Sequence, residues 1–254
     1  MNSFAVSFVV FALIFTGVFV GLALRRNLPH DHFETNAKDT VDTVRAAIGL
    51  VVTMTGLVLG MLVSSAKASY DAQKNEVAEM ASQIVLLDHL MTIYGPETKQ
   101  TRIEARRLLE KNVDRIWSSQ TSQQSRLRPD AGEHFYQQLQ LLVPKDDVQI
   151  ASKAQLMSMA LSLSKTHWLM FLVSEQTSMS TPLLMVVTSW LVIIFISFGI
   201  FAPPNLTVIV ALMVCAAAAS GAIFIIMEMY SPFSGTMRIS PAAIYDALNQ
   251  MASN

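Results

Sequence analysis

The sequence predicts an all-α integral membrane protein with four transmembrane helices and a helical extramembrane domain between the second and third spans. The 254 residues are 52% hydrophobic and only 15% charged, whereas a typical soluble domain has about 25% charged residues. The apolar residues are concentrated in four uncharged stretches, each close to the ~20 residues that a helix needs to cross a ~30 Å hydrocarbon layer. These observations make the lipid bilayer the predicted solvent of the four stretches.

The first predicted span covers residues 4–24 and ends at Arg25 and Arg26. A cleaved signal peptide fits this stretch poorly, because no basic residue precedes it and its apolar run is longer than the ~7–15 residues of a signal-peptide core. We therefore expect a retained membrane helix. Residues 27–42 are polar and are expected to form the loop that leads to the second span.

The second predicted span covers residues 46–66, and its hydrophobic periodicity continues beyond Lys67. Apolar side chains recur there at steps of three and four residues, which is typical of an amphipathic helix: Val77, Met80, Ala81, Ile84, Leu87 and Met91. We expect this span to continue out of the membrane as one long helix. Gly95 and Pro96 should end it, because glycine suits a helix C-cap and proline a first helical turn.

The middle region should contain three further polar helices, over residues 97–117, 131–142 and 148–173, with a loop at 118–125. Basic and acidic residues balance from 71 to 165, with 12 of each, so this helical domain should be neutral. A charged face of its first helix is usually solvated, and binding of a partner or of lipid headgroups is the alternative. That face carries Arg102, Arg106, Lys111 and Arg115.

The third and fourth predicted spans cover residues 183–201 and 206–227. Only Ala-Pro-Pro-Asn separates them, so the two helices should form a tight hairpin. The sequence thus divides into residues 1–70 with the first two membrane helices, 71–180 with the helical extramembrane domain, 181–230 with the membrane hairpin, and 231–254 as a C-terminal tail.

Composition and motifs exclude several classes of protein. The net charge of −1 and the pI near 6.5 give no electrostatic argument for binding nucleic acid. Cys215 is the single cysteine and is expected to be a small buried apolar residue. The sequence lacks a glycine-rich phosphate loop, a Gly-x-Ser-x-Gly motif and a Cys/His pair on a common element, so we expect neither an enzyme nor a cofactor. His30 and His32 lack the further ligands of a closed metal site.

Two pairs of glycines recur at four-residue spacing in the apolar stretches. Gly17 and Gly21 lie in the first span, and Gly56 and Gly60 lie in the second. Small residues at this spacing allow two helix backbones to approach closely. Packing within the chain is the preferred interpretation, and contact between copies is the alternative.

One face of the second span is a candidate pore lining. If several copies surround an axis, apolar side chains on this face could gate conduction by dewetting, and a serine or lysine ring beyond them would favour anions. An ordinary buried stripe is the alternative. The candidates are Thr53, Leu57 and Met61 at four-residue spacing, followed by Ser64, Ser65 and Lys67. Glu228, at the edge of the fourth span, is expected to extend toward the interface, because an ionised group is costly in hydrocarbon.

Two stretches resemble bestrophin channels. Residues 57–76, with Tyr70-Asp71, resemble the segment that lines the bestrophin pore and continues as a helix, and residues 227–235 resemble the stretch that follows the last span of these channels. The chain is more similar to the bacterial bestrophin-like family called domain of unknown function 4239. That likeness covers most of the chain and rests on Ala66-Lys67-x-x-Tyr70-Asp71, on Tyr94-Gly95-Pro96-Glu97 and on Pro232-Phe233-x-Gly235.

The resemblance implies a homopentamer with a central ion path whose apolar neck falls on Thr53, Leu57 and Met61. Two departures from bestrophins stand out. Ala72-Gln73-Lys74 replace the aromatic and arginine residues after Tyr-Asp, and Thr236-Met237-Arg238 replace the acidic cluster that binds calcium, so calcium gating is not carried over. The motif residues at the membrane edge are Tyr70, Asp71, Glu228, Pro232 and Phe233.

The membrane orientation has two opposing indications. Arg25, Arg26, Lys38 and Arg45 favour a cytoplasmic first loop, because basic residues are enriched on that side of a membrane. The resemblance implies the reverse, with both termini and the helical domain in the cytoplasm and the spans in a bacterial inner membrane. We adopt the second orientation because the charge difference is small.

Two functions are therefore predicted. The first is an oligomeric anion channel with the second span lining the pore, and the alternative is a non-conducting membrane scaffold or sensor whose helical domain binds a partner. The expected partners are the lipid bilayer, further copies of the chain and anions, and no nucleic acid. A transporter is less favoured, because transporter spans are usually broken or charged near the midplane.

Overall fold

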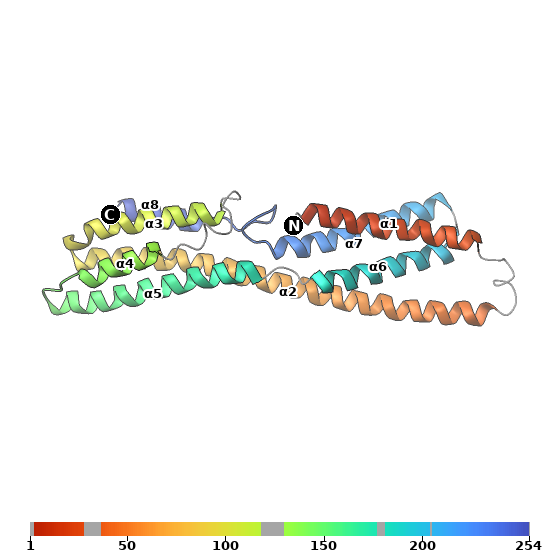
Figure 1. Cartoon of the computed structure of the whole chain (residues 1–254), viewed down its shortest axis with the longest axis horizontal. Helices are drawn as coiled ribbons and strands as arrows, with labels where there is room; N and C mark the ends of the chain where they lie inside the picture. The colour runs from red at the N-terminus through yellow and green to blue at the C-terminus, as the bar shows by residue number, and fades with distance from the viewer. Residues whose placement is uncertain (1–2, 28–36, 118–129, 177–180, 204, 254) are drawn as a thin grey trace. The chain divides into compact units, whose positions relative to one another are not determined.

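The computed structural model describes residues 3–27, 37–117, 130–176, 181–203 and 205–253 (Figure 1). These residues form helices joined by turns and contain no strand, which confirms the predicted all-α class for the described part of the chain. In chain order the elements are α1 (Ser3–Asn27), α2 (Ala37–Tyr94), the 3-10 helix η2 (Pro96–Thr98), α3 (Lys99–Trp117), α4 (Asp130–Leu141), α5 (Asp147–Gln176), α6 (Thr181–Phe201), α7 (Leu206–Met229) and α8 (Ala242–Ser253).

Four helices of the described chain, α1, α2, α6 and α7, are long and apolar enough to cross a membrane. They contain the four predicted spans. The turn from α6 to α7 is short, with the backbone N–H of Asn205 donating to the carbonyl of Pro203 at 2.8 Å. Length and composition therefore support a multi-pass membrane protein.

The prediction of one long helix from the second span onward is confirmed. Helix α2 runs without a break for 58 residues, through both the apolar stretch and the amphipathic stretch. All six predicted core positions of the amphipathic stretch are buried in one hydrophobic cluster: Val77, Met80, Ala81, Ile84, Leu87 and Met91. In aqueous solution, packing of this stripe into the hydrophobic core stabilises the amphipathic part of α2.

The chain divides into two compact units, and α2 contributes to both. The membrane unit comprises Met1–Ser69 and Ser178–Tyr230, and the polar unit comprises Tyr70–Thr177 and Ser231–Asn254. The C-terminal residues, which the sequence analysis set apart as a tail, therefore fold with the polar unit.

The membrane unit is held together by close packing of α1 on α6. A Cβ atom added at Gly21 would lie 2.9 Å from the Cα of Gly199, and one added at Gly199 would lie 2.5 Å from the carbonyl oxygen of Val18. The first glycine pair therefore packs within the chain, as preferred from the sequence. A buried hydrogen bond joins α1 to α7, since Ser220 Oγ donates to the carbonyl of Ser7 at 2.7 Å.

The prediction that Cys215 is buried is wrong. Its side chain is exposed on α7, whereas Ala216, the next residue, is completely buried. A small thiol is compatible with hydrocarbon as well as with a protein core, so an apolar span does not reveal from its sequence which of its faces is inside.

The turn from α2 to α3 lies where the sequence predicted it. Gly95 has a φ of 123°, a conformation that side chains other than glycine rarely adopt, and Pro96 opens η2. Thr98 is buried, and its Oγ1 donates to the carbonyls of Met91 at 2.5 Å and Gly95 at 2.8 Å. The hydroxyl thereby satisfies carbonyls that the end of α2 leaves without helical partners.

Helix α8 was not predicted from the sequence. It is short, at 12 residues, and it completes the polar core with side chains spaced as one helical face, namely Ile244, Ala247, Leu248 and Met251. The segment before it is bound to α3, because Trp117 Nε1 donates to the carbonyl of Ile239 at 2.8 Å and the rings of Trp117 and Phe233 meet edge to face at 5.3 Å.

Candidate pore face and its surroundings

Within the membrane unit, α2 has one covered and one uncovered face. Thr55, Leu62 and Ala66 are buried against the other membrane helices. On the opposite face, the side chains of Leu57 and Met61 are 66% and 73% exposed. The predicted pore face is therefore not covered by the other described helices of its own chain.

Helix α2 is also the least covered of the four apolar helices. Only 11% of its most apolar window is buried, compared with 33% in α1, 33% in α6 and 22% in α7. The second glycine pair lies along the same uncovered part, and an added Cβ at Gly56 or Gly60 would meet no described atom within 4 Å. These glycines therefore do not pack against the described residues of their own chain, unlike Gly21.

The candidate face is more apolar than its residue types indicate. Thr53 is exposed, but its Oγ1 donates to the carbonyl of Gly49 one helical turn earlier, at 2.8 Å. A threonine hydroxyl bonded in this way to its own helix offers no free donor to a neighbour. Thr53, Leu57 and Met61 thus form an apolar row.

Polar residues follow this row at the end of the membrane part of α2. Ser64, Ser65 and Lys67 are all exposed. Tyr230 is the residue that follows α7, and its hydroxyl donates to Ser65 Oγ at 3.4 Å. The polar end of the candidate face is therefore bound to the exit of the last span.

The prediction that the Glu228 side chain extends toward the membrane interface is wrong. Its side chain is only 2% exposed, and it takes part in a polar or electrostatic interaction within the chain. Burial of a carboxylate is costly unless such a partner compensates it. Glu228 is therefore part of the interior at the end of α7.

The other motif residues lie in the polar unit. Tyr70 and Phe233 are partly buried against its core, Pro232 is buried, and Asp71 takes part in an interaction. Pro232 accepts a hydrogen bond from the backbone N–H of Ile239 at 2.7 Å, which closes the loop before α8. The motif residues of the C-terminal stretch thus have structural contacts.

Two of the four basic residues on the charged face of α3 form ion pairs within the polar unit. Arg102 donates through Nε and an amino group to both carboxylate oxygens of Asp88, at 2.7 and 2.9 Å. Such two-point pairs are stronger and more specific than single contacts, and only 4% of the Asp88 side chain is exposed. Arg106 forms an ion pair with Glu110 at 2.9 Å. The sequence reasoning missed the Arg102–Asp88 pair, because no local pattern joins two helices across a turn.

A second polar cluster joins the turn after α2 to the turn before α5. Lys145 Nζ donates to Glu97 at 2.5 Å, and Gln149 Nε2 donates to the carbonyl of Tyr94 at 2.9 Å. The Lys145 hydrogen bond lowers the pKa of Glu97, and the same contact raises the pKa of Lys145. Glu97 and Lys145 are therefore oppositely charged at neutral pH, and their contact stabilises the packing of the two turns.

The described residues contain no group of three or more His, Cys, Asp or Glu side chains that could hold a metal ion. His30 and His32, which were considered as metal ligands, lie outside the described residues.

The comparison with protein families gives one match. A family model described as the Bestrophin-like domain matches residues 12–244, which is most of the 254-residue chain, and no curated protein sequence matches it. The resemblance seen in the sequence is thereby confirmed.

Proposed function

Because this chain belongs to the Bestrophin-like family, we propose that it is a homo-oligomeric membrane protein that conducts anions along a path lined by α2. The uncovered face of α2 carries this proposal. Leu57 and Met61 are large apolar side chains that the chain leaves more than half exposed, in the helix that has the least cover of the four.

Conduction would be controlled by the row formed by Thr53, Leu57 and Met61. When several copies bring this row to a common axis, the apolar ring excludes water unless it widens. Ser64, Ser65 and Lys67 would follow this ring along the path, and hydroxyl and ammonium donors favour anions over cations.

The family implies an assembly, and we propose five copies in a bacterial inner membrane with the polar unit in the cytoplasm. Open space at Gly56 and Gly60 supports contact between copies, because small residues let neighbouring helices approach closely in lipid. We propose no catalytic activity and no calcium gating.

The scaffold alternative keeps one observation in its favour. The connection from α4 to α5 exposes large apolar side chains, namely Leu141, Val143, Val148 and Ile150, and exposed apolar patches often bind partners. Against it, Arg102 and Arg106 are paired inside the polar unit, so the charged face offers less free basic surface than its sequence indicates.

A flux measurement on matched variants tests the channel. We expect purified protein in liposomes to carry chloride, native mass measurement to give five subunits, and Met61→Ala to raise the flux because it widens the apolar ring. Met185→Ala is the matched control, because Met185 on α6 is similarly exposed, at 66%, but lies outside the proposed path. Conducting protein in which both variants match the wild type would remove this face of α2 from the path, and a monomer without flux would favour the scaffold.

A further inference from the structure

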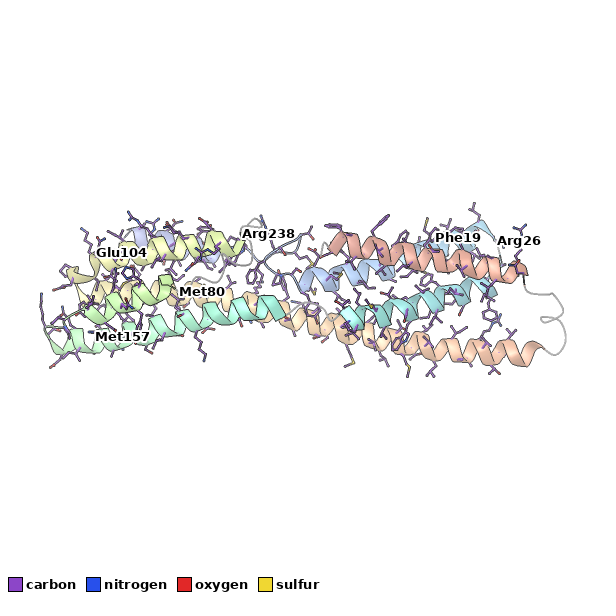
Figure 2. The ribbon with its side chains drawn as sticks, viewed as in Figure 1. Phe19, Arg26, Met80, Glu104, Met157 and Arg238 are labelled. Atoms are coloured by element: carbon purple, nitrogen blue, oxygen red, sulfur yellow. The ribbon has the colours of Figure 1, made fainter. Side chains whose placement is uncertain are left out.

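The part of α2 that belongs to the polar unit has an exposed face as well as a buried one. The buried face includes Met80 and forms part of the polar core, against which Met157 of α5 also packs; both residues are labelled in Figure 2. The exposed residues recur at steps of three and four and therefore lie on one side of the helix. We call them the uncharged face: Ser82, Val85, Leu86, His89, Thr92 and Ile93.

The uncharged face differs from the usual surface of a helix in water. It contains no Lys, Arg, Asp or Glu, and the one such residue between positions 80 and 94 is Asp88, which is buried and paired with Arg102. In α3, by contrast, nine of the residues from 99 to 115 are charged. Solvated helix faces are normally charged or polar, whereas the centres of protein interfaces are depleted of charge. The composition is therefore that of an interface.

Large apolar side chains are exposed on this face. Val85, Leu86 and Ile93 are 38%, 45% and 48% exposed. Lipid can cover such side chains in a membrane, but in the extramembrane position that the proposed function gives the polar unit, their exposure to water is unfavourable. Thr92 adds no free donor, because its Oγ1 donates to the carbonyl of Asp88 one helical turn earlier, at 3.0 Å. The face thus lacks the groups that would hold water strongly.

The neighbouring helices of the same chain leave this face open. Arg102 of α3 bonds to Asp88, and Gln83 Nε2 of α2 donates to Ser162 of α5 at 3.3 Å. Asp88 and Gln83 are not members of the uncharged face, so both helices approach α2 from other sides. The structure describes the side chains of α3 and those of α5 from 147 to 166, so the exposure is measured against both neighbours.

A second copy of the chain is the partner that this face fits. When identical parallel helices meet, each charged residue faces its own copy, and like charges in contact repel, so such a contact needs an uncharged seam. Leu86 and Ile93 are seven residues apart, which is the repeat at which apolar side chains of parallel helices pack together. Glu79, about one turn before Ser82, is exposed and limits the seam, because its copies would repel. A different partner would impose no such limit on charge.

We propose that the uncharged face of α2 is a contact between copies of the chain, with Leu86 and Ile93 of one copy packed against the same residues of the next. The inference rests on the homo-oligomeric assembly of the proposed function, but it requires neither conduction nor a particular number of copies. It adds a contact in the polar unit to the one proposed at Gly56 and Gly60. Burial of apolar surface from water drives this contact, whereas it cannot drive helix association in lipid.

Cysteine cross-linking of the full-length protein in liposomes tests this contact. The single natural cysteine is removed by Cys215→Ser, and Leu86→Cys or Ile93→Cys is then introduced and treated with a short bifunctional thiol reagent. We expect both variants to lose most of the monomer band to covalent multimers. The yield should not change when the protein is diluted in lipid, because the contact exists before the reagent is added. The melting temperature of each variant checks that it is folded.

Ile103→Cys in the same Cys215→Ser background is the matched control, because Ile103 is similarly exposed, at 43%, but lies on α3. It should remain monomeric under the same treatment. Cross-linking of Ile103→Cys equal to that of Leu86→Cys would overturn the proposal. A lack of multimers from both α2 variants, in protein that native mass measurement shows to be assembled, would overturn this contact and leave the proposed assembly standing. Multimers from both in protein without chloride flux would support the contact while removing the channel.

Discussion

The two parts of α2 differ in how far the rest of the chain covers their large apolar side chains. In the polar unit the helix buries Ile84, Leu87 and Met91 completely, whereas in the membrane unit it leaves Leu57 and Met61 more than half exposed. Water drives the first set into a core within the chain. Lipid exerts no such force, since its acyl chains are as apolar as leucine, so the second set is free to face lipid, another copy or an ion path.

The largest expected effect comes from shortening the same residue type in each part. Leu87→Ala should lower the free energy of unfolding of the polar unit by about 2–5 kcal/mol, because it opens a cavity at a completely buried site. Leu57→Ala should change stability by no more than about 0.5 kcal/mol, as is usual for exposed sites. Thermal melts followed by circular dichroism in detergent would compare them, and similar losses would show that Leu57 is covered in the assembly.

Replacing one glycine of each pair by alanine should change stability by a smaller amount, and the sign should differ between the two pairs. Gly21→Ala should destabilise the membrane unit by about 1–3 kcal/mol, because its Cβ would overpack the backbone of α6 at Gly199. Gly60→Ala should be neutral or stabilising in the single chain, by up to about 1 kcal/mol from helix propensity. Melting temperature and subunit count would be measured together. A stable Gly60→Ala protein with fewer subunits would place Gly60 in a contact between copies, and a stable Gly21→Ala protein would contradict the packing of α1 on α6.

The smallest effect concerns pH and the contact between Glu97 and Lys145. Because the hydrogen bond lowers the pKa of Glu97, its stabilisation is present above the ordinary glutamate pKa of about 4.3 and is lost as the pH falls through the lowered value. Because the pKa of Lys145 is raised, the contribution is also lost on the alkaline side. Glu97→Gln should therefore lower the melting temperature slightly at pH 7 and leave it unchanged at the acid extreme. A difference that persists in acid would point to another cause.

Local patterns predicted the elements well where one face repeats strongly. The stripe from Val77 to Met91 identified a buried helical face, and Gly95 with Pro96 identified its end, because a positive φ and a missing backbone donor are properties of single residues. Helix α8 was missed although Ile244, Leu248 and Met251 follow the same rule. Its stripe is short, and an amphipathic segment of 12 residues is stable only when packed on a partner.

For the candidate pore face as well, local spacing predicted one part and long-range packing decided the other. The spacing of Thr53, Leu57 and Met61 placed them on one helical face, but whether that face was covered depended on α1, α6 and α7. Two identical glycine motifs likewise had different environments, with Gly21 packed on α6 and Gly60 open. No property of either motif distinguishes them, because the neighbour that fills one lies far away in the sequence.

The sequence by itself determined the number of apolar helices, the continuity of α2, the turn at Gly95 and the family. Each of these depends on hydrophobic periodicity, on single-residue conformational preference or on short motifs, which are local properties of the chain. Only the tertiary structure decided that the C-terminal segment returns to the polar unit, that Arg102 is paired with Asp88 and that α2 keeps an open face in the membrane unit. These depend on which distant residues meet, and such contacts follow from the packing of the whole chain.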